Sequence, residues 1–126
     1  MRTTATVAQW LVRLTGLIQI VLGLLFWTGN QLTLVPVHML VGLILVLALW
    51  TLAFIAARSG VQPGLVVVVF LWGLLVLILG VTQDRILTGS AHWLIQVLHL
   101  LVGLAAIGQA EGLAVRIRRA APAAVA

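Results

Sequence analysis

Four long apolar segments constrain the fold of this chain more than any other feature. They cover approximately residues 7–27, 36–57, 64–82 and 91–115. Each is close to or above the roughly 20 residues that an α-helix needs to cross about 30 Å of hydrocarbon. The segments are continuously apolar rather than alternating, which excludes a membrane β-barrel. The sequence therefore predicts an all-α protein, a transmembrane four-helix bundle that forms a single domain over residues 1–126.

The composition agrees with residence in a lipid bilayer. Of 126 residues, 63% are hydrophobic and only seven basic and two acidic side chains are present, unlike a soluble globular domain. The chain has no cysteine, which excludes disulfides, zinc–thiolate sites and iron–sulfur clusters. The net charge of +5 comes from arginines that mostly flank the apolar segments, so we expect it to set membrane topology and not to bind nucleic acid.

Most of the arginines fall on one side of the predicted bundle. Arg2 precedes the first span, Arg58 follows the second, and three arginines within residues 116–119 follow the fourth. Arg13 lies inside the first span, and we expect its side chain to extend to the headgroups on this side. The positive-inside rule makes this side cytoplasmic, with both termini there, and a bacterial inner membrane is the expected location. The opposite side carries only Arg85.

Two histidines lie inside apolar segments, and each is followed by a glycine one helical turn later. These are His38 with Gly42 and His99 with Gly103. An ionisable side chain inside a membrane span is costly, so it is a functional candidate whose partner must be identified. Residues at i and i+4 share a helix face, so each motif offers a nitrogen ligand beside bare backbone. This combination suits a haem, and we expect His38 and His99 to ligate the iron of haem b with the two glycines beside the macrocycle.

Four other glycines indicate an internal repeat. Gly16 and Gly23 in the first span lie 57 positions before Gly73 and Gly80 in the third, and the two histidines are 61 positions apart. The first and last pairs of spans therefore resemble two helical hairpins related by a pseudo-twofold axis along the membrane normal. We expect these glycines to provide clearance for the edges of the haem. The alternatives are close helix packing through small residues and chance similarity between Leu/Val-rich spans.

A third histidine competes for the iron. His92 lies seven residues before His99 on nearly the same helix face. Counted from the cytoplasmic arginines, His99 matches the depth of His38, whereas His92 matches it when counted from the outer ends of the spans. No glycine follows His92 at i+4, so we favour His38 with His99 and retain His38 with His92 as the alternative. In both pairings the iron would lie toward the outer side, where Arg85 is the expected partner of the haem propionates.

Two further sets of residues indicate contacts with lipid or other helices. The five tryptophans are expected mainly at the membrane interfaces; they are Trp10, Trp27, Trp50, Trp72 and Trp93. Gly108 and Gly112 form a small-xxx-small pair on the fourth span, which is typical of a packing contact or an oligomer interface through that helix.

Four spans with His38 and His99 in matched settings resemble the small four-helix b-type membrane cytochromes. That class includes di-haem quinone-linked cytochromes and the haem-carrying anchor subunits of respiratory enzymes. The resemblance implies electron exchange with a quinol or a redox partner protein on the outer side, rather than activity as a stand-alone enzyme. Proteins of this class that carry electrons across the membrane usually stack two haems between two pairs of histidines. This chain has three histidines, enough for one such pair.

Other functional classes have less support in the sequence. No Ser/His/Asp arrangement, paired intramembrane carboxylate or phosphate loop is present, so no catalytic residues are predicted. Small proton-coupled transporters are similar in size but depend on an acidic residue deep in the first span, and residues 7–27 contain none. A structural accessory subunit of a membrane complex, without haem and with histidines that hydrogen-bond between helices, is the alternative that the sequence leaves open.

Overall fold

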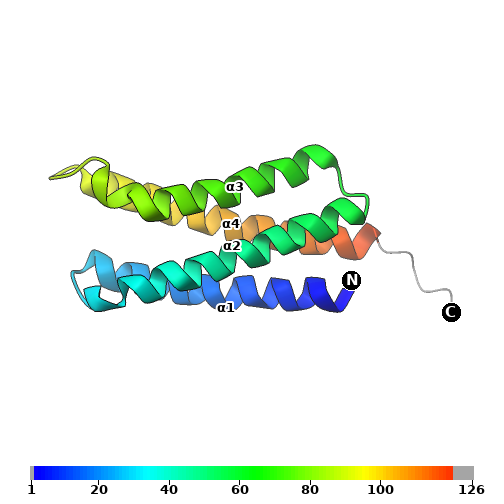
Figure 1. Cartoon of the computed structure of the whole chain (residues 1–126), viewed down its shortest axis with the longest axis horizontal. Helices are drawn as coiled ribbons and strands as arrows, with labels where there is room; N and C mark the ends of the chain where they lie inside the picture. Colours follow the sequence, from blue (N-terminus) through cyan, green and yellow to red (C-terminus); the bar gives the residue numbers. More distant parts are fainter. Residues whose placement is uncertain (1, 121–126) are drawn as a thin grey trace.

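The computed structural model describes residues 2–120, which form four long α-helices joined by short connections (Figure 1). The helices are α1 (Arg2–Trp27), α2 (Val35–Arg58), α3 (Pro63–Thr82) and α4 (His92–Ala120), with single 3₁₀ turns η1 (Leu32–Leu34) and η2 (Gln83–Arg85). All four helices are long and apolar enough to cross a membrane, and no strand is present within residues 2–120. The predicted fold class, an all-α transmembrane four-helix bundle, is confirmed.

Local sequence explains where the first three helices meet. Pro36 and Pro63 stand in the first turns of α2 and α3, where a proline is tolerated because its missing N–H would have no helical acceptor. Gly29 and Gly60 adopt φ values of 75° and 78°, a left-handed conformation that suits glycine just after a helix. The fourth helix, α4, continues through the arginines of residues 116–119, beyond the predicted end of the span at residue 115.

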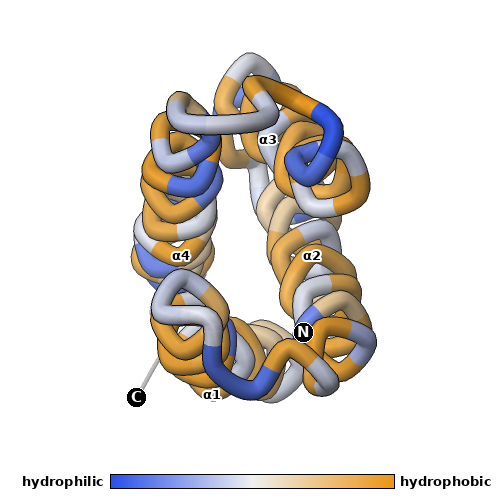
Figure 2. The backbone as a smooth tube through the Cα atoms, turned by 90° about the vertical axis from the view of Figure 1, so that its left-hand side faces the viewer, coloured by the Kyte–Doolittle hydropathy of each residue, from blue (hydrophilic) through white to orange (hydrophobic). Residues whose placement is uncertain are grey.

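The four helices form a bundle with an elongated cross-section. Viewed along its axis, the order around the bundle is α1, α2, α3, α4, with α1 and α3 at the far ends of the long dimension (Figure 2). Each helix contacts the next one in this order, α4 contacts α1, and α2 also contacts α4 across the short dimension. An exchange of α1 with α3 and of α2 with α4 preserves this pattern, as expected for two hairpins related by a pseudo-twofold axis.

The two ends of the bundle differ in packing. We call them the arginine end, which contains the start of α1 and the close of α4, and the histidine end, which contains the α1–α2 and α3–α4 connections (Figure 1). The main core lies toward the arginine end; its buried members are Ala5, Ala8, Val12, Leu45, Val46, Ala48, Leu49, Leu52, Ala53, Ile55, Ala56, Val69, Ala106, Ala110, Leu113 and Ile117.

The histidine end has a much smaller core. Its buried cluster consists of Leu79, Ile95 and Val102, and α2 contributes no buried residue before Leu45. Since burial of apolar side chains is what holds helices at close-packed distances, the helices at this end are less tightly joined through protein contacts. The histidine end therefore has the sparser protein core.

Candidate functional site

His38 and His99 face each other across the short dimension of the bundle. Their ring centroids lie 6.3 Å apart, with the ring planes inclined at 47°. His38 stands three residues after the start of α2, whereas His99 stands seven residues after the start of α4. Helix α4 thus begins about one turn further out, roughly 6 Å at 1.5 Å per residue. Because α4 begins further out, His38 and His99 lie at the same depth in the bundle although they stand at different distances from the starts of their helices.

Both imidazoles are partly buried and incompletely bonded. The Nδ1 atoms of His38 and His99 are buried and have no hydrogen-bond partner, although buried polar atoms in folded proteins are nearly always paired. The edge of His38 also contacts Phe26, with ring centroids 5.3 Å apart in a T-shaped arrangement. Two unpartnered ring nitrogens therefore lie on facing helices, and Oε1 of Gln19, whose amide lies beside Gly42, is also buried without a partner.

A glycine stands beside each of the two rings. A Cβ atom at Gly23 of α1 would lie 3.9 Å from Cε1 of His38, and one at Gly80 of α3 would lie 3.8 Å from Cε1 of His99. At these distances a methyl group would be in ordinary van der Waals contact with each ring. Each histidine thus packs against a glycine of its own hairpin, and the two contacts occupy equivalent positions in the repeat.

The first glycine of each pair has a different neighbour. A Cβ at Gly16 would meet Cδ1 of Ile107 on α4 at 2.6 Å, and one at Gly73 would collide with the indole of Trp50 on α2. Both glycines admit a large side chain from the other hairpin, as the packing alternative predicts. Their role depends on the side chain that reaches them, which glycine spacing does not reveal.

The glycines that follow the histidines also lie apart from the rings. The amide of Gln19 occupies the space beside Gly42, because a Cβ there would lie 2.6 Å from Nε2 of Gln19. No atom lies within 4 Å of the corresponding position at Gly103. Of the six glycines expected near a cofactor, the structure therefore brings Gly23 and Gly80 to the histidine rings.

His92 is the first residue of α4, and Arg85 ends η2 in the α3–α4 connection. The Nδ1 of His92 lies within hydrogen-bonding distance of the Ile86 carbonyl, at 3.2 Å, and this contact closes the connection onto the start of α4. Arg85 is exposed at the end of η2, and within residues 2–120 it forms no ion pair with its neighbour Asp84. The structure thus pairs His38 with His99, engages His92 elsewhere, and leaves the Arg85 guanidinium exposed at the histidine end.

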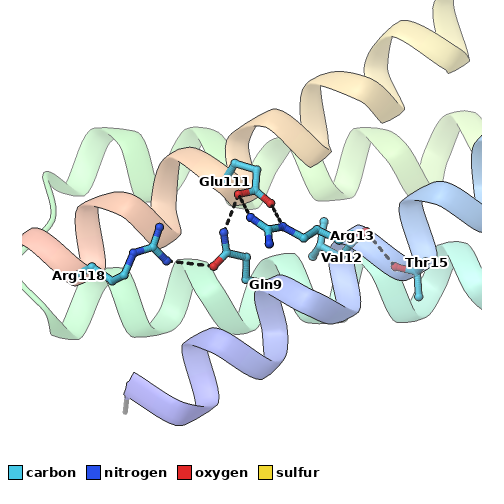
Figure 3. Close-up of polar contacts among 6 residues, drawn as sticks. All are labelled: Gln9, Val12, Arg13, Thr15, Glu111 and Arg118. Atoms are coloured by element: carbon cyan, nitrogen blue, oxygen red, sulfur yellow. Dashed lines mark hydrogen bonds and ion pairs between the residues drawn. The ribbon is translucent and has the colours of Figure 1, made fainter.

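A polar network that the sequence did not predict joins α1 to α4 nearer the arginine end (Figure 3). Arg13 donates two hydrogen bonds to the carboxylate of Glu111, from Nε at 2.6 Å and from Nη2 at 2.8 Å. Gln9 donates to the same carboxylate at 2.5 Å and accepts a bond from Arg118 at 3.0 Å. The expectation that Arg13 extends to the headgroups did not include this partner, because Glu111 stands 98 positions away in the chain.

Two tryptophans join helices through their indole N–H groups. The indole N–H of Trp50 donates to the Phe70 carbonyl at 3.1 Å, and that of Trp72 donates to the Val102 carbonyl at 3.0 Å. These bonds link α2 to α3 and α3 to α4. The other three tryptophans have exposed side chains, as interfacial residues would; they are Trp10, Trp27 and Trp93.

Comparisons of the chain with models of known protein families, with curated proteins and with solved structures found no match. Function must therefore be inferred from the chemistry of the site. Within residues 2–120, no group of three or more His, Cys, Asp or Glu side chains converges as a metal site would require. A tetrahedral zinc site takes three or four protein ligands. The facing histidines alone suit a metal that arrives with most of its ligands already in place.

Proposed function

We propose that this chain is an electron-transfer protein of the membrane that binds one haem b between α2 and α4, with His38 and His99 as axial ligands. The observation that carries the proposal is the facing pair of imidazoles, each with an unpartnered buried Nδ1, at the sparsely packed end of the bundle. In functional class it would be a small b-type cytochrome.

The spacing of the two rings fits a shared metal. Two metal–nitrogen bonds of about 2 Å each, plus about 1 Å from each nitrogen to its ring centroid, separate two opposed imidazole centroids by about 6 Å. The centroids of His38 and His99 lie 6.3 Å apart. A porphyrin supplies four equatorial nitrogens, so two protein ligands complete its coordination. The number of available protein ligands therefore favours haem over zinc or copper, for which the described residues offer too few ligands.

The surroundings of the rings also suit a large flat group. Gly23 and Gly80 keep side-chain atoms away from the Cε1 edges of the two imidazoles. Helix α2 buries no residue over positions 35–44, so inserting a cofactor there would displace little close-packed core. Arg85 is exposed at the same end and provides a guanidinium for a propionate carboxylate.

A bound haem would supply one-electron chemistry. Its position at one end of the bundle favours exchange with a quinol or a redox partner protein on that side of the membrane. The arginines at the other end, Arg2, Arg58 and those of residues 116–119, favour a cytoplasmic arginine end. In a bacterial inner membrane, the histidine end and its haem would then face the outer leaflet.

The absorption spectrum of the protein purified in detergent, after expression with ample haem, tests the proposal. We expect a Soret band, sharp α and β bands on reduction, and about one haem per chain, as for low-spin bis-histidine iron. His38→Ala and His99→Ala should each abolish these bands. A haem-free wild type, or a spectrum unchanged in both variants, would overturn the proposal and leave a structural accessory subunit as the remaining interpretation.

A further inference from the structure

A second site lies at the arginine end, between the last turns of α4 and the α2–α3 connection. It is an open pocket of about 450 Å³, and its lining residues are Val61, Gln62, Leu65, Arg116, Arg119 and Ala120. The volume lies within the range of small-molecule sites, about 300–1,000 Å³. Two guanidinium groups on one wall and two apolar side chains on another make the pocket both cationic and amphipathic.

Within residues 2–120, no carboxylate forms an ion pair with either of these two arginines. The chain has two acidic side chains: Asp84 lies in η2 at the opposite end, and Glu111 is bonded to Arg13 and Gln9. Arg116 donates one bond to the Gly112 carbonyl of its own helix at 3.1 Å, which leaves its other N–H groups for a ligand.

The arginines at this end have different contacts. Arg118 turns toward α1, where it donates to Gln9, whereas Arg116 and Arg119 line the pocket. Arg58 lies over the ring of Phe54, with its guanidinium carbon 5.6 Å from the ring centroid, and it does not line the pocket. The charge in the pocket is therefore a specific pair of side chains and not the general charge of this end.

We propose that the pocket binds the phosphate headgroup of an anionic phospholipid from the leaflet at the arginine end. Guanidinium groups bind phosphate oxygens bidentately, and basic pockets between spanning helices are a recurring form of headgroup site. The pocket stands where α2 and α4 end and α3 begins, so in a spanning bundle it would lie near the headgroups. Val61 and Leu65 provide apolar contact for the lipid portion next to the phosphate. The inference is independent of the haem proposal.

The test is lipid binding by purified protein, measured by native mass spectrometry in a mild detergent. Wild-type protein should bind phosphatidylglycerol at about one molecule per chain and phosphatidylcholine much more weakly. Arg116→Gln and Arg119→Gln should each weaken phosphatidylglycerol binding about fivefold, and the double variant about 30-fold. Arg58→Gln removes the same charge from the same end outside the pocket, and it should change binding by less than about twofold.

Three results would overturn the inference. Equal loss in Arg58→Gln would mean that the general charge of this end attracts the lipid. Equal binding of phosphatidylcholine would mean that the anionic headgroup is not recognised. Competition by inorganic phosphate at concentrations equal to those of the lipid would make the pocket a site for free phosphate. Circular dichroism of each variant should show unchanged helix content, because the substituted side chains are exposed.

Discussion

Arg13 of α1 and Glu111 of α4 form an ion pair at the position where the other half of the bundle has an aromatic stack. The repeat offsets of 57 and 61 positions relate Arg13 to Phe70 and Trp50 to Glu111. Arg13 Nε lies 2.6 Å from the Glu111 carboxylate, and the rings of Trp50 and Phe70 stack with centroids 4.7 Å apart. The two hairpins therefore retain the position of an interhelical contact while its chemistry differs.

Replacing the ion pair by its aromatic equivalent tests this relationship. Arg13→Phe should lower the thermal unfolding temperature because it leaves Glu111 without its cation, and Glu111→Trp should do so because it leaves Arg13 without its anion. The double variant should regain at least half of the summed loss, since two rings can stack there as Trp50 and Phe70 do. Unfolding scans of the four proteins in one detergent measure this coupling. A double variant whose loss equals the sum of the single losses would show that the two positions are not equivalent.

Gly73→Ala should destabilise the bundle. Its Cβ would collide with the indole of Trp50, which is a rigid group held by its bond to the Phe70 carbonyl. Overpacking of this kind costs about 1–3 kcal/mol. Gly103→Ala is the matched control, because its Cβ meets no atom within 4 Å and removing a helical glycine gains up to about 1 kcal/mol. Chemical denaturation should show a lower free energy of unfolding for Gly73→Ala and a higher one for Gly103→Ala. A change in the same direction in both variants would contradict the assignment of Gly73 to packing.

Gly23→Leu should impair haem binding. The added side chain would extend toward the imidazole of His38, whose Cε1 lies 3.9 Å from the Cβ position. We expect about tenfold weaker haem retention on dilution, corresponding to a moderate overpacking penalty, and Gly23→Ala should retain haem. Gly108→Leu controls for a bulky residue at an open helical position. Normal retention in Gly23→Leu would place the haem away from His38.

His92→Ala distinguishes the two ligand pairs. The variant loses the contact with the Ile86 carbonyl, which should cost about 1 kcal/mol of stability or less. Its reduced α and β bands should equal those of the wild type, whereas His99→Ala should lack them. Loss of the bands in His92→Ala together with their survival in His99→Ala would assign the iron to His38 and His92.

The sparsely packed histidine end should respond most strongly to haem. Without cofactor, amides near His38 should exchange hydrogen faster than those around Leu49 in the main core, because fewer buried contacts oppose local opening. Haem binding should protect the region around His38 most, since the ligand stabilises the closed state. Hydrogen exchange followed by mass spectrometry compares the two preparations. Uniform protection along α2 would contradict a cofactor located at this end.

Sequence patterns predicted the helices and the histidine pair for physical reasons that act locally. Apolar runs long enough to span hydrocarbon leave only the helix as a structure that satisfies its own backbone. The repeat then placed His38 and His99 in equivalent hairpins, and the structure brings those two rings together. Which histidine of α4 faces His38 could not be read from the sequence, because it depends on how far α4 extends beyond α2.

The glycines show where sequence patterns reached their limit. Gly16 and Gly23 both lie in the apolar sequence of α1, and each has a counterpart in α3 at the same offset. Nevertheless, Gly16 meets Ile107 of α4 and Gly23 meets His38 of α2. What a glycine accommodates is decided by the side chain that a different helix places against it. That depends on the rotation and height of two helices, which the local sequence around either glycine does not specify.

Hydropathy and charge in the sequence determined that this protein is a four-helix membrane bundle with its three histidines at one end and most of its arginines at the other. Only the tertiary structure decided which distant side chains meet. Glu111 binds Arg13 of α1, while Arg116 and Arg119 line a pocket, and Gln19 takes the space beside Gly42. Whether a segment lies in lipid depends on its average polarity, which is a local property of the sequence. Which side chains meet between helices depends on how the helices are placed relative to one another, and packing throughout the bundle decides that placement.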